Sequence, residues 1–307
     1  MWGVLASRIS RFLLVTFGVS TLVFFLIHLV PGDPVEVMLG ESASVTDREA
    51  MRVSLNLHLP IWQQLALYYQ HLFQLDLGTS LHSSQPVVTI IMSRLGATIE
   101  LAIAALIIAI LLAIPLGTIA AKRHRQWPDY LSSSIALFGI SVPNFVAGPV
   151  LILLFAIYLG WLPVSGRAGV ASMVLPALTL GTAMAAILSR MLRSSLLDVM
   201  HTPYVLSARA RGLSETRILF KHIYPNAMLP VITLLGLQLG GLLAGAIITE
   251  TIFSWPGIGL LTIEAIQKRD YPLVQGCVIL ISVSYILVNM CTDILYRVID
   301  PRIREAT

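Results

Sequence analysis

The chain between residues 204 and 226 reads Tyr204-Val-Leu-Ser-Ala-Arg-Ala-Arg-Gly-Leu-Ser-Glu-Thr-Arg-Ile-Leu-Phe-Lys-His-Ile-Tyr-Pro-Asn226, a basic segment between two long apolar runs. A proline at 203 suits the first turn of a helix, and Gly212 offers a left-handed backbone that would end this helix near Arg211. Ser214 is placed to cap a second helix from Glu215 to about His222, which Pro225 is expected to end. The segment therefore predicts a compact knob of two short helices.

The predicted knob is basic on its exposed face, which carries Arg209, Arg211, Arg217 and Lys221. Such a loop could be a passive topology anchor or could bind anionic lipid. Anchoring needs only charge, however, whereas proline, glycine and serine in this order specify a shape. We therefore favour a docking surface.

Composition places the rest of the chain in a membrane. The 307 residues are 56% hydrophobic and 12% charged, with a mean hydropathy of +0.83, far more apolar than soluble proteins. Crossing about 30 Å of hydrocarbon takes about 20 apolar residues. Six stretches qualify, and the first is too long for a signal peptide. They cover approximately 9–30, 97–121, 131–160, 172–192, 227–250 and 275–297.

The basic residues predict the orientation, because cytoplasmic segments carry the excess of Lys and Arg. With both termini inside, fourteen of the 20 fall on inner segments and six on outer ones. The inner set is Arg8, Arg11, Lys122, Arg123, Arg125, Arg190, Arg193, Arg209, Arg211, Arg217, Lys221, Arg297, Arg302 and Arg304. The net charge of +4 then follows from topology, and nothing in it requires a nucleic-acid partner.

The outer segment at 31–96 is expected to hold helices of its own. Thr46-Asp-Arg-Glu49 fits a capping box, and the amphipathic stretch 61–73 follows it. This segment is predicted to be either a lid packed on the helix ends or a surface that contacts a delivery protein or gates the outer mouth.

The apolar spans carry breaks and small residues. Prolines at 115, 143, 149 and 176 are each expected to interrupt a helix, because each removes one amide. Gly236-x-x-x-Gly240 and Gly241-x-x-x-Gly245 place small residues one turn apart, which allows another helix to approach closely.

The ionisable residues in the spans lie near their ends. Glu100 and Glu250 are expected at the outer ends, shallow enough to reach water, and Asp293 and Arg297 can pair at the inner end of the last span. No relay of charges crosses the membrane. A proton-driven carrier would need ionisable groups near the midplane.

The chain resembles the membrane-spanning permease subunits of ATP-binding-cassette (ABC) importers, in the peptide and nickel branch. The family signature is Glu-Ala-Ala, three residues, Gly, nine residues, then Ile-x-Leu-Pro; here Leu206-Ser-Ala208, Gly212, His222, Tyr224 and Pro225 occupy those positions. The acidic first residue and the apolar Ile and Leu are absent. Further matching segments are Pro31-Gly-Asp-Pro34, Leu75-Asp-Leu-Gly-Thr-Ser80, Trp161-Leu-Pro-Val-Ser-Gly166, Glu250-Thr-Ile-Phe-Ser-Trp-Pro-Gly-Ile-Gly259, Arg269-Asp-Tyr-Pro272 and Asp300-Pro-Arg-Ile-Arg304.

The resemblance implies an all-α membrane protein with six transmembrane helices, of the type I ABC importer permease kind, in the bacterial cytoplasmic membrane. It also implies a second, homologous permease, two cytosolic ATPases that hold Mg-ATP, and an extracytoplasmic solute-binding protein. The knob would be the coupling helix that contacts an ATPase. The residues implied in coupling are Ser207, Ala208, Arg209, Ala210, Arg211, Gly212, Leu213, Ser214, Glu215 and Pro225, and those of a possible outer gate or translocation path are Glu100, Glu250, Trp255, Pro256 and Asp270.

The chain itself is not expected to be an enzyme or to bind a cofactor. It contains no Gly-x-x-x-x-Gly-Lys-Ser/Thr loop to cradle nucleotide phosphates and no nucleophile with a matching base. The alternatives are an ATPase-independent carrier or channel, an intramembrane enzyme and a structural scaffold.

The cargo is left open among di- or oligopeptides, glutathione and a nickel chelate. His28, His58, His71 and His82 are expected on or near the outer side, without the compact spacing of metal ligands.

Overall fold

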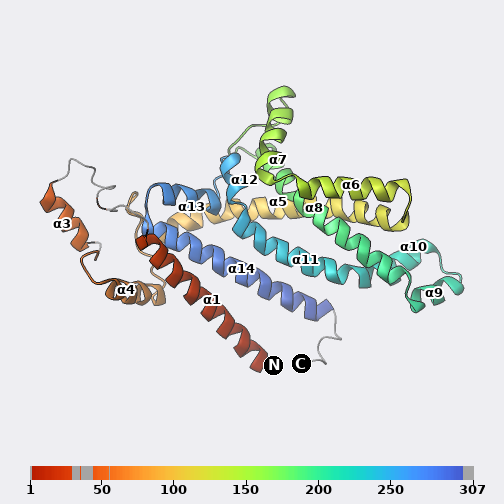
Figure 1. The fold of residues 1–307 in the computed structure, drawn as a ribbon, viewed down its shortest axis with the longest axis horizontal. Helices are drawn as coiled ribbons and strands as arrows, with labels where there is room; N and C mark the ends of the chain where they lie inside the picture. The colour runs from red at the N-terminus through yellow and green to blue at the C-terminus, as the bar shows by residue number, and fades with distance from the viewer. Residues whose placement is uncertain (1, 30–34, 36–43, 55, 300–307) are drawn as a thin grey trace. The chain divides into compact units, whose positions relative to one another are not determined.

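The computed structural model describes residues 2–29, 35, 44–54 and 56–299, and these are mostly helical (Figure 1). Among these residues, one isolated bridge joins Thr79 and Pro86. The label η marks segments that are π-helical. In chain order the elements are α1 Trp2–Leu29, α3 Val45–Ser54, α4 Ile61–Phe73, α5 Val87–Lys122, α6 Trp127–Ser141, α7 Asn144–Leu151, η1 Ile152–Tyr158, α8 Val170–Met200, α9 Pro203–Ala210, α10 Glu215–Ile218, η2 Leu219–Ile223, α11 Tyr224–Gly245, α12 Ile247–Ile252, α13 Ile258–Gln267 and α14 Tyr271–Ile299.

Helices occupy all six predicted apolar stretches, and most extend beyond them. Within the described residues, four continuous helical segments are long and apolar enough to cross a membrane: Val87–Lys122, Val170–Met200, Glu215–Leu242 and Tyr271–Thr292. The third predicted stretch is a bent pair, in which α6 and α7–η1 meet at 102°. In α1 the apolar part is shorter, Leu13–Phe25.

Of the four prolines expected to interrupt helices, only Pro143 separates two of them. Val142 before it is extended, at φ −90° and ψ 112°, as the residue preceding a proline prefers, and Pro143 then serves as the N-cap of α7. Pro115, Pro149 and Pro176 lie inside α5, α7 and α8. The prediction was wrong for these three, since each helix continues past its proline. A membrane helix can tolerate a missing amide where neighbouring helices satisfy the carbonyl that it leaves free.

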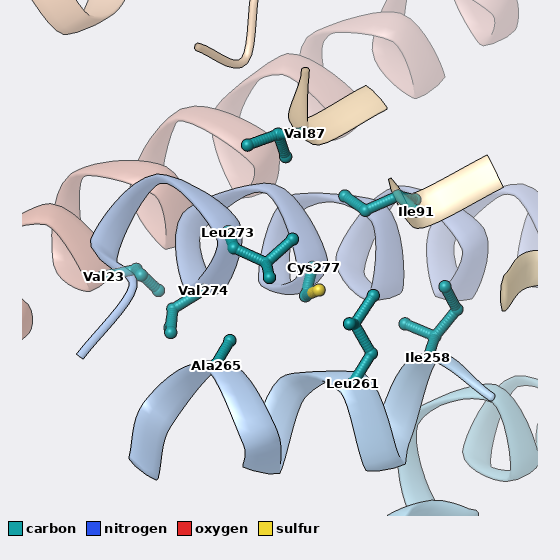
Figure 2. Close-up of a cluster of buried hydrophobic side chains, with 9 residues drawn as sticks. All are labelled: Val23, Val87, Ile91, Ile258, Leu261, Ala265, Leu273, Val274 and Cys277. Carbon is teal, nitrogen blue, oxygen red and sulfur yellow. The ribbon is translucent and has the colours of Figure 1, made fainter. Parts of the chain in front are cut away.

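The chain divides into two compact units, the first made of residues 1–98 and 256–284. Its core gathers side chains from α1, α5, α13 and α14 (Figure 2). Figure 2 shows Val87 and Ile91 of α5 opposite Leu273 and Cys277 of α14. At Gly276 of α14 a Cβ atom would lie 2.6 Å from Val87 Cγ1, so glycine permits this close approach.

Two helices of the predicted outer segment also belong to this unit. α4 matches the predicted range 61–73 and packs on α1, where Tyr69 stacks on Phe17 at 4.7 Å between ring centroids and its hydroxyl lies 3.0 Å from Ser20 Oγ. α3 begins earlier than the predicted capping box. Ser44 Oγ accepts the Asp47 amide and donates to the Asp47 carboxylate, so the residue that caps α3 is Ser44 and not Thr46. Packing of α4 on α1 favours a lid.

The second unit, residues 99–255 and 285–307, is built around α8, with α6, α7, α11 and α12 packed on it. Two glycines bring α8 against α5. A Cβ at Gly181 would lie 2.8 Å from Ala105 O, and a Cβ at Gly117 would lie 2.8 Å from Ser189 O. The two helices are therefore in contact at backbone level.

The two glycine pairs of the fifth predicted span have different surroundings. Gly236 and Gly240 face Thr292 and Tyr285 of α14, so this pair brings two helices of the same chain together, as predicted. Gly241 has no neighbour within 4 Å of an added Cβ, and the side-chain surroundings of Gly245, like those of Asp293 and Arg297, lie outside the described residues.

Candidate functional site

The loop between α8 and α11 carries the predicted knob, and its first helix ends at a glycine. α9 starts at Pro203, as predicted, with Thr202 as its N-cap residue. At its end the Gly212 amide donates to Arg209 O (2.9 Å) and the Leu213 amide to Ala208 O (3.4 Å), with Gly212 at φ +76°. These two bonds form a Schellman motif, which needs a left-handed residue after the helix.

The second helix does not end at Pro225. It runs from Glu215 through α10 and the π-helical η2 into α11, and Pro225 is the second residue of α11. The π-helical turn precedes the proline, and the His222 carbonyl accepts hydrogen bonds from Asn226 Nδ2 (3.0 Å) and the Tyr204 hydroxyl (3.4 Å). The wide turn lets the helix pass the proline without its amide. The predicted knob is therefore rigidly continuous with the apolar helix after it.

Ser214 stands at the predicted N-cap position but its side chain makes no capping hydrogen bond. The Ile218 amide instead donates to the Ser214 backbone carbonyl at 2.9 Å. The predicted role of its hydroxyl is therefore wrong, and its extended backbone is what allows the turn.

One face of the knob is apolar and buried within the second unit, to which the knob belongs. The fully or nearly fully buried side chains are Val205, Ala208, Ile218, Leu219 and Ile223. Ser195 Oγ of α8 also donates to Ala227 O at 2.8 Å, which ties α8 to the start of α11. Because burying these apolar groups stabilises one arrangement, the knob is held firmly on its two long helices.

The opposite face contains most of the predicted coupling residues. Ser207, Arg209, Ala210, Arg211, Gly212, Ser214, Glu215 and Pro225 are exposed, and Leu213 is half-buried. Ala208 has no exposed surface, so it contributes packing beneath the surface and not contact with a partner.

Arg209 and Glu215 form an ion pair across the glycine turn. Arg209 Nε lies 2.9 Å from Glu215 Oε1 and its Nη2 lies 3.2 Å from Oε2, a bidentate geometry. The pair links the two helices across the turn and neutralises Arg209. The positive charge predicted for the knob therefore comes from Arg211, Arg217 and Lys221, which are exposed.

Sequence reasoning missed the apolar part of the exposed face. Leu206 is 52% exposed and Phe220 is 66% exposed, and the Phe220 ring stacks on Tyr224 at 5.4 Å. Large apolar groups at the surface of a basic loop suit a protein interface. The sequence feature that could have indicated this exposed apolar surface is the i, i+4 spacing of Phe220 and Tyr224 on a helix rich in charge.

Three of the predicted outer residues lie in the second unit. Arg167 donates to Glu100 Oε2 from Nη2 (2.7 Å) and Nε (3.0 Å), and its Cζ lies 6.0 Å from the centroid of the Trp255 ring. Glu250 on α12 has no exposed surface, so the expectation that it is wetted was wrong. Glu250 is therefore part of the packed interior. Burying a carboxylate in this way is costly unless it has partners.

The other two predicted outer residues, Pro256 and Asp270, lie in the first unit. Asp270 is 1% exposed, and its carboxylate accepts hydrogen bonds from Ser80 Oγ (2.5 Å), the Leu81 amide (3.2 Å) and the Leu273 amide (3.3 Å). These bonds tie the 80–86 turn to the start of α14, which favours a structural role. Pro256 is half-buried.

The predicted outer histidines do not come together in the described part of the chain. His58, His71 and His82 are exposed, and His71 Nδ1 lies 3.4 Å from Asp76 Oδ2. Across the described residues, no three histidine, cysteine or acidic side chains are grouped as metal ligands. The side chain of His28 lies outside the described residues.

Comparisons with known proteins match almost the whole chain. Residues 113–305 match the family described as binding-protein-dependent transport system inner membrane component, and residues 1–102 match its N-terminal counterpart. The chain is 41% identical over 304 residues, 99% of both chains, to the glutathione transport system permease protein GsiC of Escherichia coli O6:H1 and of Escherichia coli K12. The same protein of Shigella dysenteriae matches equally.

Solved structures show the same fold at lower identity. The MetNI methionine ABC transporter in inward-facing conformations aligns with a TM-score of 0.56 and 16% identity over 69% of this chain and 97% of that chain. An amino acid ABC transporter aligns with a TM-score of 0.53 and 17% identity over 70% and 94%. The fold is that of a type I ABC importer permease.

Proposed function

The chain belongs to the family of binding-protein-dependent transport system inner membrane components, and we propose that its 203–225 knob couples transport to ATP hydrolysis on partner subunits. The chain is a transmembrane permease subunit of an ABC importer, a multi-pass protein of the inner membrane. ATPase and solute-binding components belong to such an importer.

The observation that carries the proposal is the construction of the knob. Its buried face, the Schellman turn at Gly212 and the unbroken path from Glu215 to Gly245 make it a rigid extension of α8 and α11. A force applied to its exposed face would therefore move two membrane helices and would not be absorbed by the loop. This mechanical property is what an ATP-driven change of access needs.

Hydrolysis itself is assigned to two cytosolic ATPases, which hold Mg-ATP. The printed sequence has no Gly-x-x-x-x-Gly-Lys-Ser/Thr loop, which supports this division of labour. The excess of basic residues on the predicted inner segments supports cytoplasmic termini and a knob that faces the cytosol. A second, non-identical permease completes the path, and membrane lipid surrounds the pair.

The proposed cargo is glutathione or another small peptide. Identity of 41% that extends over 99% of both chains to a glutathione permease supports this choice over a nickel chelate. The solute-binding protein would select the cargo outside the membrane and deliver it to the permease pair.

The test is uptake into proteoliposomes that hold both permeases and both ATPases, with the cognate binding protein outside. We expect glutathione or small peptides to stimulate ATP hydrolysis and to accumulate only with ATP and binding protein present. Chelated nickel is the matched comparison. Accumulation of nickel alone would contradict the peptide cargo, and accumulation without ATP would contradict the coupling.

A further inference from the structure

A buried carboxylate at the predicted inner end of α6 has no part in the proposed coupling surface. Asp129 is 3% exposed. Its Oδ1 accepts Arg193 Nε at 2.6 Å, and its Oδ2 accepts Arg193 Nη2 at 2.8 Å and the Arg125 amide at 2.9 Å. His124 Nδ1 lies 3.2 Å from Oδ2. The side chain thus joins the turn before α6 to α8, whose Arg193 lies 64 positions away in the sequence.

Arg193 presents the matching fork from α8. Its guanidinium meets both carboxylate oxygens side by side, the geometry in which arginine and carboxylate bind most strongly. Its side chain is 28% exposed, so the pair is screened from water more than a surface ion pair. Arg193 lies seven residues, about two helical turns, before the end of α8 at Met200.

The turn that Asp129 caps is itself strained. Arg125 has a φ of +60°, a left-handed conformation that a residue with a side chain seldom adopts. Its amide is held by the Asp129 carboxylate. The carboxylate therefore fixes both the α5–α6 turn and the distance between α6 and α8.

From this pair a continuous packing route leads toward α12. α6 lies along α8, and a Cβ at Gly139 would meet Ala186 Cβ at 3.0 Å. After the 102° bend, a Cβ at Gly148 of α7 would lie 3.3 Å from side-chain atoms of Ile252 and Phe253. Figure 1 shows α6 alongside α8 and α7 next to α12.

We propose that Asp129 and Arg193 form a positioning pair that makes the inner half of α6 move with α8, so that displacement of the knob reaches the α6–α7 bend. This proposal rests on the coupling role of the knob. Only the pair provides a charged, directional link between the two helices at this end, within the described residues. Apolar packing between the two helices is non-directional and supplies no such link.

The test replaces Asp129 and Arg193 together by neutral side chains. This neutral pair separates a role in positioning α6 from a role in the stability of the subunit. A single Asp129→Asn change leaves Arg193 without its counter-charge, which can destabilise the subunit. The double variant Asp129→Asn/Arg193→Gln removes both charges together and leaves a polar side chain at each position. We expect it to assemble and melt like the natural complex but to move about fivefold less cargo per ATP hydrolysed, a typical size for lost coupling between sites.

Two further variants complete the experiment in the reconstituted complex. Arg190→Gln makes the same change at an exposed position of α8 and should keep the natural ratio of uptake to hydrolysis. Arg193→Lys keeps the charge but loses the bidentate fork, and should show an intermediate ratio. A natural ratio in the neutral pair, or uptake losses that only follow the amount of assembled complex, would overturn the proposal.

Gly212→Pro in the same assay separates the positioning role of the Asp129–Arg193 pair from the coupling role of the knob. If Gly212→Pro uncouples transport while the neutral pair does not, the positioning role is wrong and the knob keeps its coupling role. If neither variant changes the ratio, both proposals fall.

Discussion

Gly212→Pro is expected to lower uptake per ATP hydrolysed by about tenfold or more, since coupling free energies of about 1–3 kcal/mol correspond to about 5–150-fold. Gly212 has a φ of +76°, whereas proline is fixed near −65°. The substitution also removes the amide that donates to Arg209 O. The two short helices would then meet at a different angle, and the Arg209–Glu215 pair would break. Reconstituted complexes give the measurement, with uptake and phosphate release followed together.

Two controls isolate the cause. Gly160 has a similar φ of +63° in a loop outside the knob, so Gly160→Pro imposes the same backbone conflict and should leave the ratio of uptake to hydrolysis unchanged. Gly212→Ala keeps the amide, and no atom lies within 4 Å of the added Cβ, so it should cost only the left-handed backbone, about 1 kcal/mol. Equal loss of coupling at Gly160 would show that the effect is not specific to the knob.

Gly181→Leu is expected to prevent assembly of the subunit. A Cβ at this position already lies 2.8 Å from Ala105 O and from Ile108 Cβ of α5, and a leucine adds three more carbons. Backbone atoms of a packed helix cannot move aside cheaply, so overpacking costs about 1–3 kcal/mol or more. The yield of the complex after detergent extraction and its melting temperature give the measurement, and both should fall strongly.

Gly96→Leu is the matched control. Gly96 lies on α5, and nothing lies within 4 Å of its added Cβ. The same increase in volume should leave the yield close to that of the natural complex. If Gly181→Leu extracted and melted like Gly96→Leu, the close contact of α5 with α8 would be wrong.

The apolar stretches and the first half of the knob could be predicted from sequence because local signals decide them. The presence of each long helix follows from its apolar stretch, although most helices extend beyond it, and α9 follows from Pro203 and Gly212 through local backbone preferences alone. α4 was predicted to the residue for the same reason, since its amphipathic period is bounded by Pro60. Each of these features depends on residues within one or two turns of each other.

The errors arise where distant residues decide the outcome. Pro225 reads as a helix end, but the helix continues through it from the π-helical η2 into α11. Glu250 reads as shallow and wetted, but the packing around α12 buries it completely. The Asp129–Arg193 pair joins residues 64 positions apart, and no local pattern indicates such a partner.

The most direct test of the coupling role is photo-crosslinking from single positions in the assembled importer. A benzophenone amino acid at Arg211 or Phe220, both exposed on the knob, should crosslink to an ATPase subunit, whereas one at the exposed Trp62 of α4 should not. Crosslinks to the ATPase from Trp62, or from neither position of the knob, would contradict the account.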